Sequence, residues 1–375
     1  MSGSEPVKGP GNGPRIERIL NAGQVLQVWL ENTPEPLELP WFWVRDNSQD
    51  PESVNLDTMQ RTVDSFAIDL DLRPASCELV DQQIRIYWTD DSPVSVLPAD
   101  LLASLAQGSG DHRSLWHSSA QVAATPLGFD EVVGTEDGLR RWTEAVGRHG
   151  FGLVTGAPGT AESVRTLADR VGYVRRSVFG DVWLLSSTVE DHADSAYDTT
   201  YLEPHTDGSY CHDGPGLQLF ACAERSGTGG ESVLLDGFAA AEVLRDQNPH
   251  SFELLTTVEV PAHYIEDGVE LRARRPTIRL APDGSVEQVT FNNYDRSAFL
   301  LPPDQLRRWH DAYSQLHDLI IDQDRWWTHR LEPGEVLLFD NWRCLHGRMA
   351  YTGARKFHGC YLNHEDLESR LRVLG

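Results

Sequence analysis

Cysteine is scarce in this chain of 375 residues, and the patterns that cysteine usually forms are missing. The five cysteines lie far apart, and no two of them form a CxxC pair. A disulfide framework and a thiolate zinc site both depend on recurring, regularly spaced cysteines, so the sequence predicts neither. The cysteines are Cys77, Cys211, Cys222, Cys344 and Cys360.

Long apolar runs and an excess of positive charge are also lacking. No run of about 18 apolar residues occurs, so no segment is predicted to span a membrane. The chain has 57 acidic and 32 basic residues, which gives a formal net charge of −25. Such a surface repels phosphate backbones and anionic lipids, so binding to nucleic acid or to a membrane is disfavoured. A cationic small molecule would be attracted.

The first residues lack the apolar core of a signal peptide and the arginine-rich pattern of a transit peptide. We expect residues 1–14 to form a flexible tail rich in glycine and proline, and we expect a cytoplasmic protein. The hydrophobic fraction of 40% is sufficient for buried cores. The length indicates about two domains.

Residues 15–106 are predicted to form a small β-rich N-terminal domain. Near alternation of apolar and polar residues at 24–30 and 84–88, with many β-branched and aromatic side chains, is typical of strands. Clusters of turn-forming residues separate these segments. A polar stretch near residues 107–119 is a plausible linker.

Residues 120–375 combine predicted helices and strands. Apolar residues at spacings of three and four predict helices near 139–146 and 164–171 and over 303–322. Short strands separated by Gly-rich turns, with a few flanking helices, favour a double-stranded β-helix, or jelly roll. The predicted strands are 217–221, 232–235, 288–291, 335–339 and 358–362.

His205 and Asp207 stand two residues apart in a segment that can be extended. Residues i and i+2 of a strand point to the same side, so both side chains can bind one metal ion. A further ligand is needed, and the candidate is His346, which follows a hydrophobic strand expected beside the first. Two histidines and one carboxylate leave coordination positions open, as in Fe(II) oxygenases. We predict that His205, Asp207 and His346 hold Fe(II) and are the catalytic residues.

Arg355 stands nine residues beyond His346. The open positions on iron can take the two donor atoms of a 2-oxo acid and then O2. A 2-oxoglutarate molecule bound in this way has a second carboxylate, which a guanidinium can grip with two parallel hydrogen bonds. We therefore predict that Arg355 anchors 2-oxoglutarate.

Motifs along nearly the whole chain resemble those of the gamma-butyrobetaine and trimethyllysine hydroxylases of carnitine biosynthesis. These motifs are Trp-Val-Arg-Asp-Asn at 43–47, His-Thr-Asp at 205–207, Gly-Thr-Gly-Gly at 227–230, Asp-Gly-Phe at 236–238, Phe-Asn-Asn at 291–293, residues 340–348 and Ser-Arg-Leu-Arg at 369–372. Residues 264–267, 293–296 and 359–362 are more similar to the trimethyllysine branch.

The resemblance implies a small N-terminal β domain, a catalytic double-stranded β-helix and a homodimer. It also implies hydroxylation of an unactivated C–H bond, with 2-oxoglutarate converted to succinate and CO2 and with ascorbate as a reductant. In this family His205, Asp207 and His346 match the iron ligands, and Arg355 matches the residue that binds 2-oxoglutarate.

One departure from the family lies in the turn after residues 43–47. The butyrobetaine enzymes hold a structural zinc there with a cysteine-rich turn, whereas residues 48–53 read Ser-Gln-Asp-Pro-Glu-Ser. Without thiolates or imidazoles a closed zinc site cannot form. No zinc is predicted, and packing alone must hold the N-terminal domain.

A second departure concerns the substrate. The family binds a quaternary ammonium group between aromatic faces, which attract a cation that cannot donate hydrogen bonds. Among the matching residues, Phe179 stands where the family has tyrosine. These residues could equally be a simple lining of the barrel. They are Phe179, Trp183, Tyr197 and Tyr361.

Asp194 is a candidate for a charged contact with the substrate. The trimethyllysine enzymes carry an aspartate here, whereas butyrobetaine hydroxylase has an amide. A carboxylate repels a substrate carboxylate but pairs with an amino group, which favours trimethyllysine or another amino acid over butyrobetaine. Asn292 and Asn293 are neutral hydrogen-bonding candidates. Asp194 could equally be a solvated loop charge.

The predicted function is therefore Fe(II)- and 2-oxoglutarate-dependent hydroxylation of a small cationic or zwitterionic substrate. One alternative is the same chemistry on a substrate with an unrelated molecular scaffold, in specialised metabolism. A non-catalytic ligand-binding protein is a further alternative. It is disfavoured because it would not need all four residues of the metal and cosubstrate sites, which are His205, Asp207, His346 and Arg355. A zinc hydrolase could use the three metal ligands but would not need Arg355. A halogenase is disfavoured because Asp207 fills the position that a halide would take.

Overall fold

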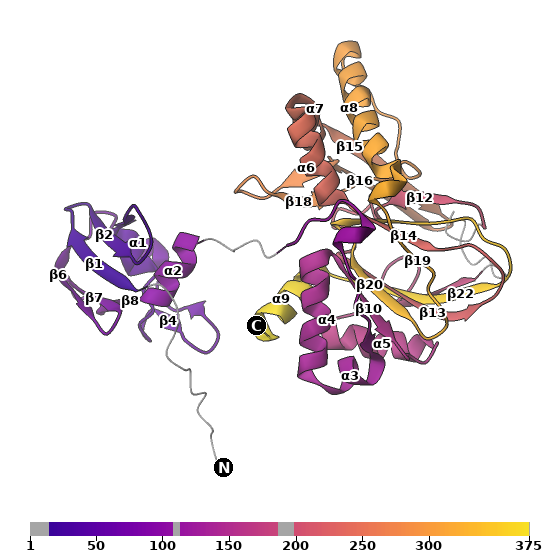
Figure 1. Ribbon diagram of the computed structural model, residues 1–375. Coiled ribbons are helices and arrows are strands. Elements are labelled where there is room, and N and C mark those ends of the chain that lie inside the picture. Colours follow the sequence, from indigo (N-terminus) through magenta and orange to yellow (C-terminus); the bar gives the residue numbers. More distant parts are fainter. Residues whose placement is uncertain (1–14, 108–112, 187–198, 375) are drawn as a thin grey trace. The chain divides into compact units, whose positions relative to one another are not determined.

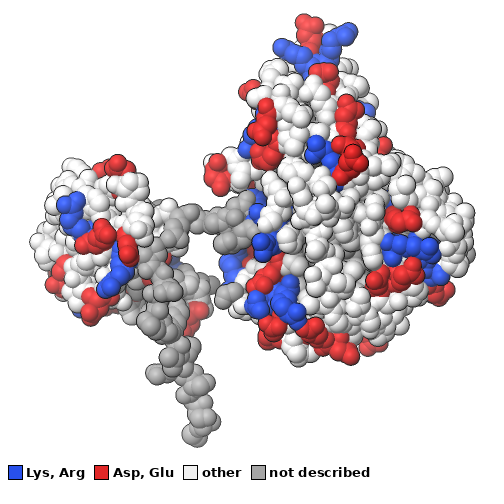
Figure 2. Space-filling view, viewed as in Figure 1, with Lys and Arg blue, Asp and Glu red and all other residues white. Residues whose placement is uncertain are grey.

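The computed structural model describes residues 15–107, 113–186 and 199–374 (Figure 1). The chain divides into two compact units, Met1–Asp111 and His112–Gly375. Among the described residues, no helix is both long enough and apolar enough to cross a membrane. On the face of the larger unit that Figure 2 shows, basic side chains occur in small groups beside acidic ones.

The N-terminal unit contains two antiparallel three-stranded sheets and two helices. One sheet has the order β1-β2-β3 and the other has the order β6-β7-β8. Alternate residues of β2 are buried, and Leu26 and Val28 pack with Ile84 and Ile86 of β7 in one apolar cluster. The elements are β1 (Ile16–Asn21), β2 (Val25–Leu30), β3 (Leu37–Pro40), α1 (Trp41–Asp46), β4 (Val54–Asn55), β5 (Gln60–Arg61), β6 (Pro74–Val80), β7 (Gln83–Trp88), β8 (Ser95–Pro98) and α2 (Ala99–Gln107).

Hydrogen bonds among side chains fix the turn that follows α1. Arg45 Nη1 donates to Ser53 Oγ at 2.7 Å, and Ser48 Oγ donates to Asp50 Oδ2 at 2.6 Å. Burial raises the pKa of Asp50, but hydrogen bonds from Ser48 and Ser53 outweigh it, so the net pKa is lowered. The Ser48 hydroxyl also accepts from the Val96 N–H of β8. A polar network, and not packing alone as the sequence suggested, therefore contributes to holding this turn.

The larger unit is built on two sheets that face each other. Their strand orders are β11-β22-β13-β20-β10-β9 and β12-β21-β14-β19. Side chains from both sheets meet in one apolar cluster, which includes Leu337 and Phe357 from the first sheet and Leu234 and Trp327 from the second. The strands are β9 (Leu127–Gly128), β10 (Phe151–Thr155), β11 (Val182–Ser186), β12 (Leu202–His205), β13 (Leu217–Arg225), β14 (Ser232–Asp236), β19 (Trp327–His329), β20 (Val336–Asp340), β21 (Cys344–Arg348) and β22 (Arg355–Leu362).

Helices cover the two sheets on opposite sides (Figure 1). Helices α3, α4, α5 and α9 pack on the six-stranded sheet, and α6, α7 and α8 form a second cluster with β14 and β18. Two hairpins, β15-β16 and β17-β18, lie between α7 and α8 in the sequence. These elements are α3 (Phe129–Gly134), α4 (Glu136–His149), α5 (Ala161–Val171), α6 (Gly237–Gln247), α7 (Pro249–Thr257), β15 (Glu259–Glu266), β16 (Val269–Pro276), β17 (Ile278–Leu280), β18 (Val286–Val289), α8 (Pro303–Ile321) and α9 (His364–Leu374).

Most of the predicted helices and strands are present, with shifted ends. The helix predicted over 303–322 is α8, and its stripe of apolar residues is packed into the second cluster. The strand predicted over 288–291 is wrong at its end, because β18 stops at Val289. Beyond it, Thr290 N–H donates to Thr277, and the carbonyl of Phe291 accepts from Thr206 N–H. The β15-β16 hairpin is not among the predicted elements.

The short connection between β20 and β21 is anchored by a buried ion pair. Arg343 Nη2 lies 2.7 Å from Asp236 Oδ2, and both side chains are almost fully buried. Asp236 also caps α6 by accepting from two backbone N–H groups of that helix. The guanidinium donates further to the carbonyls of Ser114 and Arg148. This pair ties the connection to α6 and to the segment that precedes α3.

His364, the first residue of α9, should make stability depend on pH. Its ring stacks on Trp342, with centroids 4.4 Å apart, and its nitrogens lie 3.3 Å from Asp340 and 3.4 Å from Glu368. Burial lowers the pKa of His364, but the two carboxylates outweigh burial and raise it from 6.5 to about 10. The folded state therefore holds a proton that the unfolded chain releases near pH 6.5.

This stabilisation should be fully present below pH 6.5 and lost as the pH rises through about 10. Each unit of pKa shift corresponds to about 1.4 kcal/mol, so we expect the free energy of unfolding to fall by up to about 5 kcal/mol across that range. The measurement is urea unfolding at a series of pH values for the wild type and for His364→Gln. The variant should lose this part of the pH dependence. An equal slope in both proteins would contradict the assignment.

Candidate active site

The close pairing of β12 and β21 brings two histidines together. The strands run antiparallel, and His205 stands directly opposite His346, with ring centroids 4.5 Å apart. Gly347 allows this approach, because a Cβ at this position would lie 2.6 Å from the carbonyl oxygen of Leu202. A larger residue would therefore force the two strands apart.

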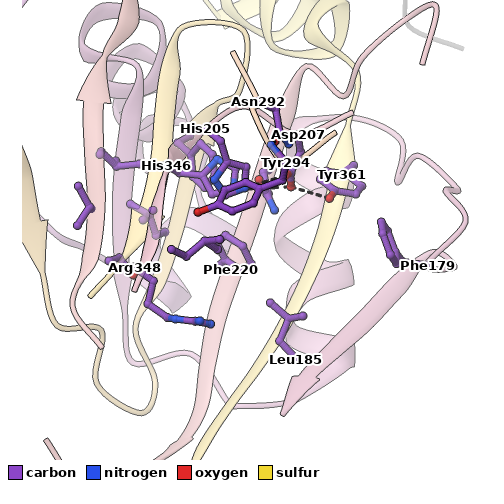
Figure 3. Close-up of a pocket in the computed structure, with 18 of the residues that line it drawn as sticks. Phe179, Leu185, His205, Asp207, Phe220, Asn292, Tyr294, His346, Arg348 and Tyr361 are labelled. Atoms are coloured by element: carbon purple, nitrogen blue, oxygen red, sulfur yellow. Dashed lines mark hydrogen bonds and ion pairs between the residues drawn. The ribbon is translucent and has the colours of Figure 1, made fainter. Parts of the chain in front are cut away.

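Asp207 lies just beyond the end of β12 and is held by the β20–β21 connection. Its N–H donates to Asn341 Oδ1 at 2.9 Å, and Asn341 Nδ2 donates back to its carbonyl at 3.1 Å. Its carboxylate oxygens lie 3.3 Å from His205 Nε2 and 3.7 Å from His346 Nε2. The Tyr361 hydroxyl donates to the carboxylate at 2.7 Å (Figure 3).

The three side chains fit a divalent metal ion. One ligand atom from each lies within 4.8 Å of the others, and no other such group of three occurs among the described residues. His205 Nδ1 faces the carbonyl of Glu203 at 2.8 Å, and donation of a proton there leaves Nε2 available to a metal. Two imidazoles and a carboxylate are the donors used by non-haem Fe(II) oxygenases.

The protonation of these groups also suits metal binding. Burial lowers the pKa of His346 to about 3, so this ring is neutral. Burial raises the pKa of Asp207, but the two histidines and the Tyr361 hydroxyl outweigh it and hold the carboxyl ionised. Burial lowers the pKa of His205, but Asp207 outweighs burial and raises it. Metal binding and protonation would therefore compete at His205.

A cavity of about 290 Å³ lies beside the three residues, and it is lined by two arginines, the buried Arg348 and the half-buried Arg355. Burial, and then the charge of Arg348, lower the pKa of Arg355 to about 9. The two guanidinium carbons lie 5.1 Å and 5.7 Å from the centroid of the Tyr351 ring. Two neighbouring guanidiniums favour an anionic ligand such as a carboxylate.

Sequence reasoning missed Arg348, although a signal was available. His346 and Arg348 stand two residues apart on β21, so their side chains lie on the same face of the strand. Figure 3 shows the Arg348 side chain extending along the cavity away from the histidines. Its Nη2 also donates to the carbonyl of Thr200 at 3.1 Å.

Three of the four predicted cage residues line the cavity, namely Phe179, Trp183 and Tyr361. The Trp183 ring lies 5.4 Å from that of Tyr361. Trp183 stands opposite Gly359 on β22, where a Cβ would overlap the indole. Tyr197 lies outside the described residues, as does Asp194.

Phe179 belongs to a second aromatic group in the cavity wall. Its ring lies 5.8 Å from that of Tyr264, which lies 5.0 Å from that of Tyr210. Both tyrosines line the cavity, and the sequence analysis named neither as a site residue.

The two predicted asparagines have different environments. Asn292 lines the cavity, and its Nδ2 donates to Asp295 at 2.8 Å. Asn293 is exposed and outside the cavity lining, and its Oδ1 accepts from Arg296 at 3.0 Å. The asparagines are adjacent in a loop, where no strand or helix period indicates which of them points inward.

Comparison with known proteins identifies a family and relatives that match most of the chain. Residues 117–361 match the family described as "Taurine catabolism dioxygenase TauD, TfdA family". A mitochondrial trimethyllysine dioxygenase of Bos taurus is 31% identical over 90% of this chain and 83% of its own length. A trimethyllysine dioxygenase of Meyerozyma guilliermondii is 31% identical over 89% of each chain. A gamma-butyrobetaine dioxygenase of Pongo abelii is 27% identical over 95% of each chain.

Gly347→Ala should separate the two histidine strands and weaken metal binding. We expect the affinity for Fe(II), measured by anaerobic calorimetry, to fall by roughly 10- to 100-fold, as for other residues that orient metal ligands. Gly134→Ala is the matched control, because nothing lies within 4 Å of a Cβ at that position. Circular dichroism would show that both variants fold. An unchanged affinity in a folded Gly347→Ala protein would refute the role of this close approach.

Proposed function

Since this chain belongs to the TauD, TfdA family, on the branch that contains the trimethyllysine and gamma-butyrobetaine dioxygenases, it is a 2-oxoglutarate-dependent oxygenase, and we propose that it hydroxylates a small cationic or zwitterionic substrate. The observation that carries the proposal is the cavity in which aromatic rings, two arginines and the three candidate metal ligands meet. Cations bind to aromatic faces, and carboxylates bind to guanidiniums.

The cosubstrate end of the proposed site is made by the two arginines. Fe(II) held by His205, Asp207 and His346 would, with O2 and 2-oxoglutarate, supply the oxidising chemistry that yields succinate and CO2. Arg355, supported by Arg348, would bind the far carboxylate of 2-oxoglutarate. Ascorbate would serve as an external reductant.

The substrate end is proposed to prefer trimethyllysine or a related amino acid over butyrobetaine. Phe179, Trp183 and Tyr361, with Tyr197, would provide the aromatic surface for a quaternary ammonium. Asn292 would provide a neutral contact from the cavity wall. The trimethyllysine dioxygenases, at 30–31% identity, are also more similar to this chain than the butyrobetaine enzyme is at 27%.

Several broader features belong to the same proposal. The two facing sheets would form a double-stranded β-helix within a catalytic domain over residues 120–375, preceded by a β-rich domain over 15–106. We further propose a cytoplasmic homodimer without a structural zinc. Residues 48–53 contain no thiolate or imidazole, which supports the last point.

The second candidate function is the same hydroxylation of a substrate with an unrelated carbon skeleton, in specialised metabolism. Phe179 favours it, because a phenyl face attracts a cation less strongly than a phenol does. The replacement of the cysteine-rich turn by residues 48–53 also indicates divergence from the enzymes of carnitine biosynthesis.

Succinate formation would distinguish the two candidates. The reaction contains 2-oxoglutarate, Fe(II), ascorbate and O2, with trimethyllysine, gamma-butyrobetaine or no added substrate. We expect the greatest stimulation by trimethyllysine. Slow iron-dependent succinate formation that neither compound stimulates would refute the proposed substrate class and favour the second function. No iron-dependent succinate under any condition would refute the proposed reaction.

Arg355→Ala should raise the KM for 2-oxoglutarate strongly. Loss of one partner of a buried charged pair costs about 2–5 kcal/mol, so we expect an increase of roughly 30-fold or more. Lys356→Ala removes the same charge from the next residue, which pairs with Glu224 at the surface, and should leave KM unchanged. Equal KM values in the two variants would refute the role of Arg355.

A further inference from the structure

Asp295 is a second carboxylate in the cavity, apart from the candidate metal ligands. Among the described residues that line the cavity, the only acidic side chains are Asp207 and Asp295. Asp207 is used by the metal site. Neither the metal site nor the cosubstrate end has a need for Asp295.

The Asp295 carboxylate is held in a fixed position. Its Oδ2 accepts hydrogen bonds from Ser209 Oγ and from Asn292 Nδ2, each at 2.8 Å. Its backbone carbonyl accepts from the His263 N–H of β15 at 3.0 Å. Two side chains thus fix the carboxylate, and His263 fixes the backbone of Asp295. A fixed side chain loses little conformational entropy when a ligand binds.

The charge of Asp295 lies away from the arginine end of the cavity. In Figure 3, Arg348 and Asn292 lie on opposite sides of the His205 ring. The Asn292 side chain donates a hydrogen bond to the Asp295 carboxylate. The cavity therefore has guanidiniums toward one end and a carboxylate toward the other, with the candidate metal ligands between. A ligand carboxylate is repelled near Asp295, and a ligand cation is attracted.

Two kinds of cation call for two kinds of site. A quaternary ammonium has no proton to donate, so aromatic faces suit it best. A primary ammonium has three N–H donors and binds a carboxylate through charge-assisted hydrogen bonds. The cavity offers both, since aromatic rings and Asp295 line its wall together.

We propose that Asp295 binds the primary ammonium of the substrate and selects an N-methylated basic amino acid over a related acid that lacks the amino group. The inference rests on the proposed function and deepens it. Butyrobetaine has no primary amine, so this contact would separate the two substrate classes within one reaction type.

The negative charge of Asp295 can be removed without removing the structural contacts of this residue. Asp295→Asn keeps the shape of the side chain, and its amide oxygen can still accept from Ser209 and Asn292. The backbone contact with His263 does not depend on the side chain. The variant should therefore keep its fold and lose only the negative charge.

The test compares trimethyllysine with 6-(trimethylammonio)hexanoate, which differs only in lacking the amino group. Binding is measured by anaerobic calorimetry on the full chain loaded with Fe(II) and 2-oxoglutarate. Wild-type protein should bind trimethyllysine at least tenfold more tightly than the analogue. In Asp295→Asn this ratio should fall to within about twofold, because trimethyllysine loses affinity while the analogue does not.

Asp267→Asn is the matched control, because it removes the same charge from the exposed turn of the β15-β16 hairpin. It should retain the wild-type ratio. A ratio that persists in Asp295→Asn would overturn the proposal, and so would a wild-type protein that does not prefer trimethyllysine. Iron-dependent succinate formation, stimulated by trimethyllysine, reports separately on the proposed function, so a failure of Asp295 alone is recognisable.

Discussion

The site depends on the close approach of β12 and β21. Because these strands pair with His205 opposite His346, two candidate metal ligands that are 141 positions apart in the sequence become direct neighbours. Gly347 is the residue that makes the approach possible. The same strand carries Arg348 two residues beyond His346, about 7 Å along the chain. One strand pairing therefore sets both the metal site and its spacing from the positive end of the cavity.

The third candidate ligand, Asp207, is placed by contacts outside that pairing. Asp207 follows the end of β12, where no strand partner fixes it, and Asn341 takes over by bonding to both its N–H and its carbonyl. Asn341 belongs to the connection that Arg343 anchors against Asp236. Removing one member of such a buried pair costs roughly 3–5 kcal/mol, because the other charge is left buried. The position of Asp207 is thus linked to the stability of the fold around α6.

Spacing rules explain what the sequence could and could not predict. The sequence predicts His205, Asp207 and Arg355 as site residues because a strand period or a coordination chemistry relates them to one another, and all three line the cavity. Tyr264 and Asp295 were not assigned as site residues, because they reach the cavity through a hairpin and a loop whose positions are set by long-range contacts. Their segments, 264–267 and 293–296, resemble the trimethyllysine branch, but that resemblance assigns no role to either residue. Packing, and not local pattern, gives these residues their role.

The uneven distribution of charge in the cavity constrains how any substrate can lie. A net charge of −25 attracts cations to the whole molecule and does not orient them. Orientation requires fixed charges at short range, and Arg348, Arg355 and Asp295 are such charges within one cavity. The two arginines would hold the far carboxylate of 2-oxoglutarate and Asp295 would hold the primary ammonium of the substrate, so the two molecules occupy different ends of the cavity and the substrate binds in one direction only. The carbon presented to the candidate metal ligands is then determined by its distance along the molecule from the group that Asp295 holds.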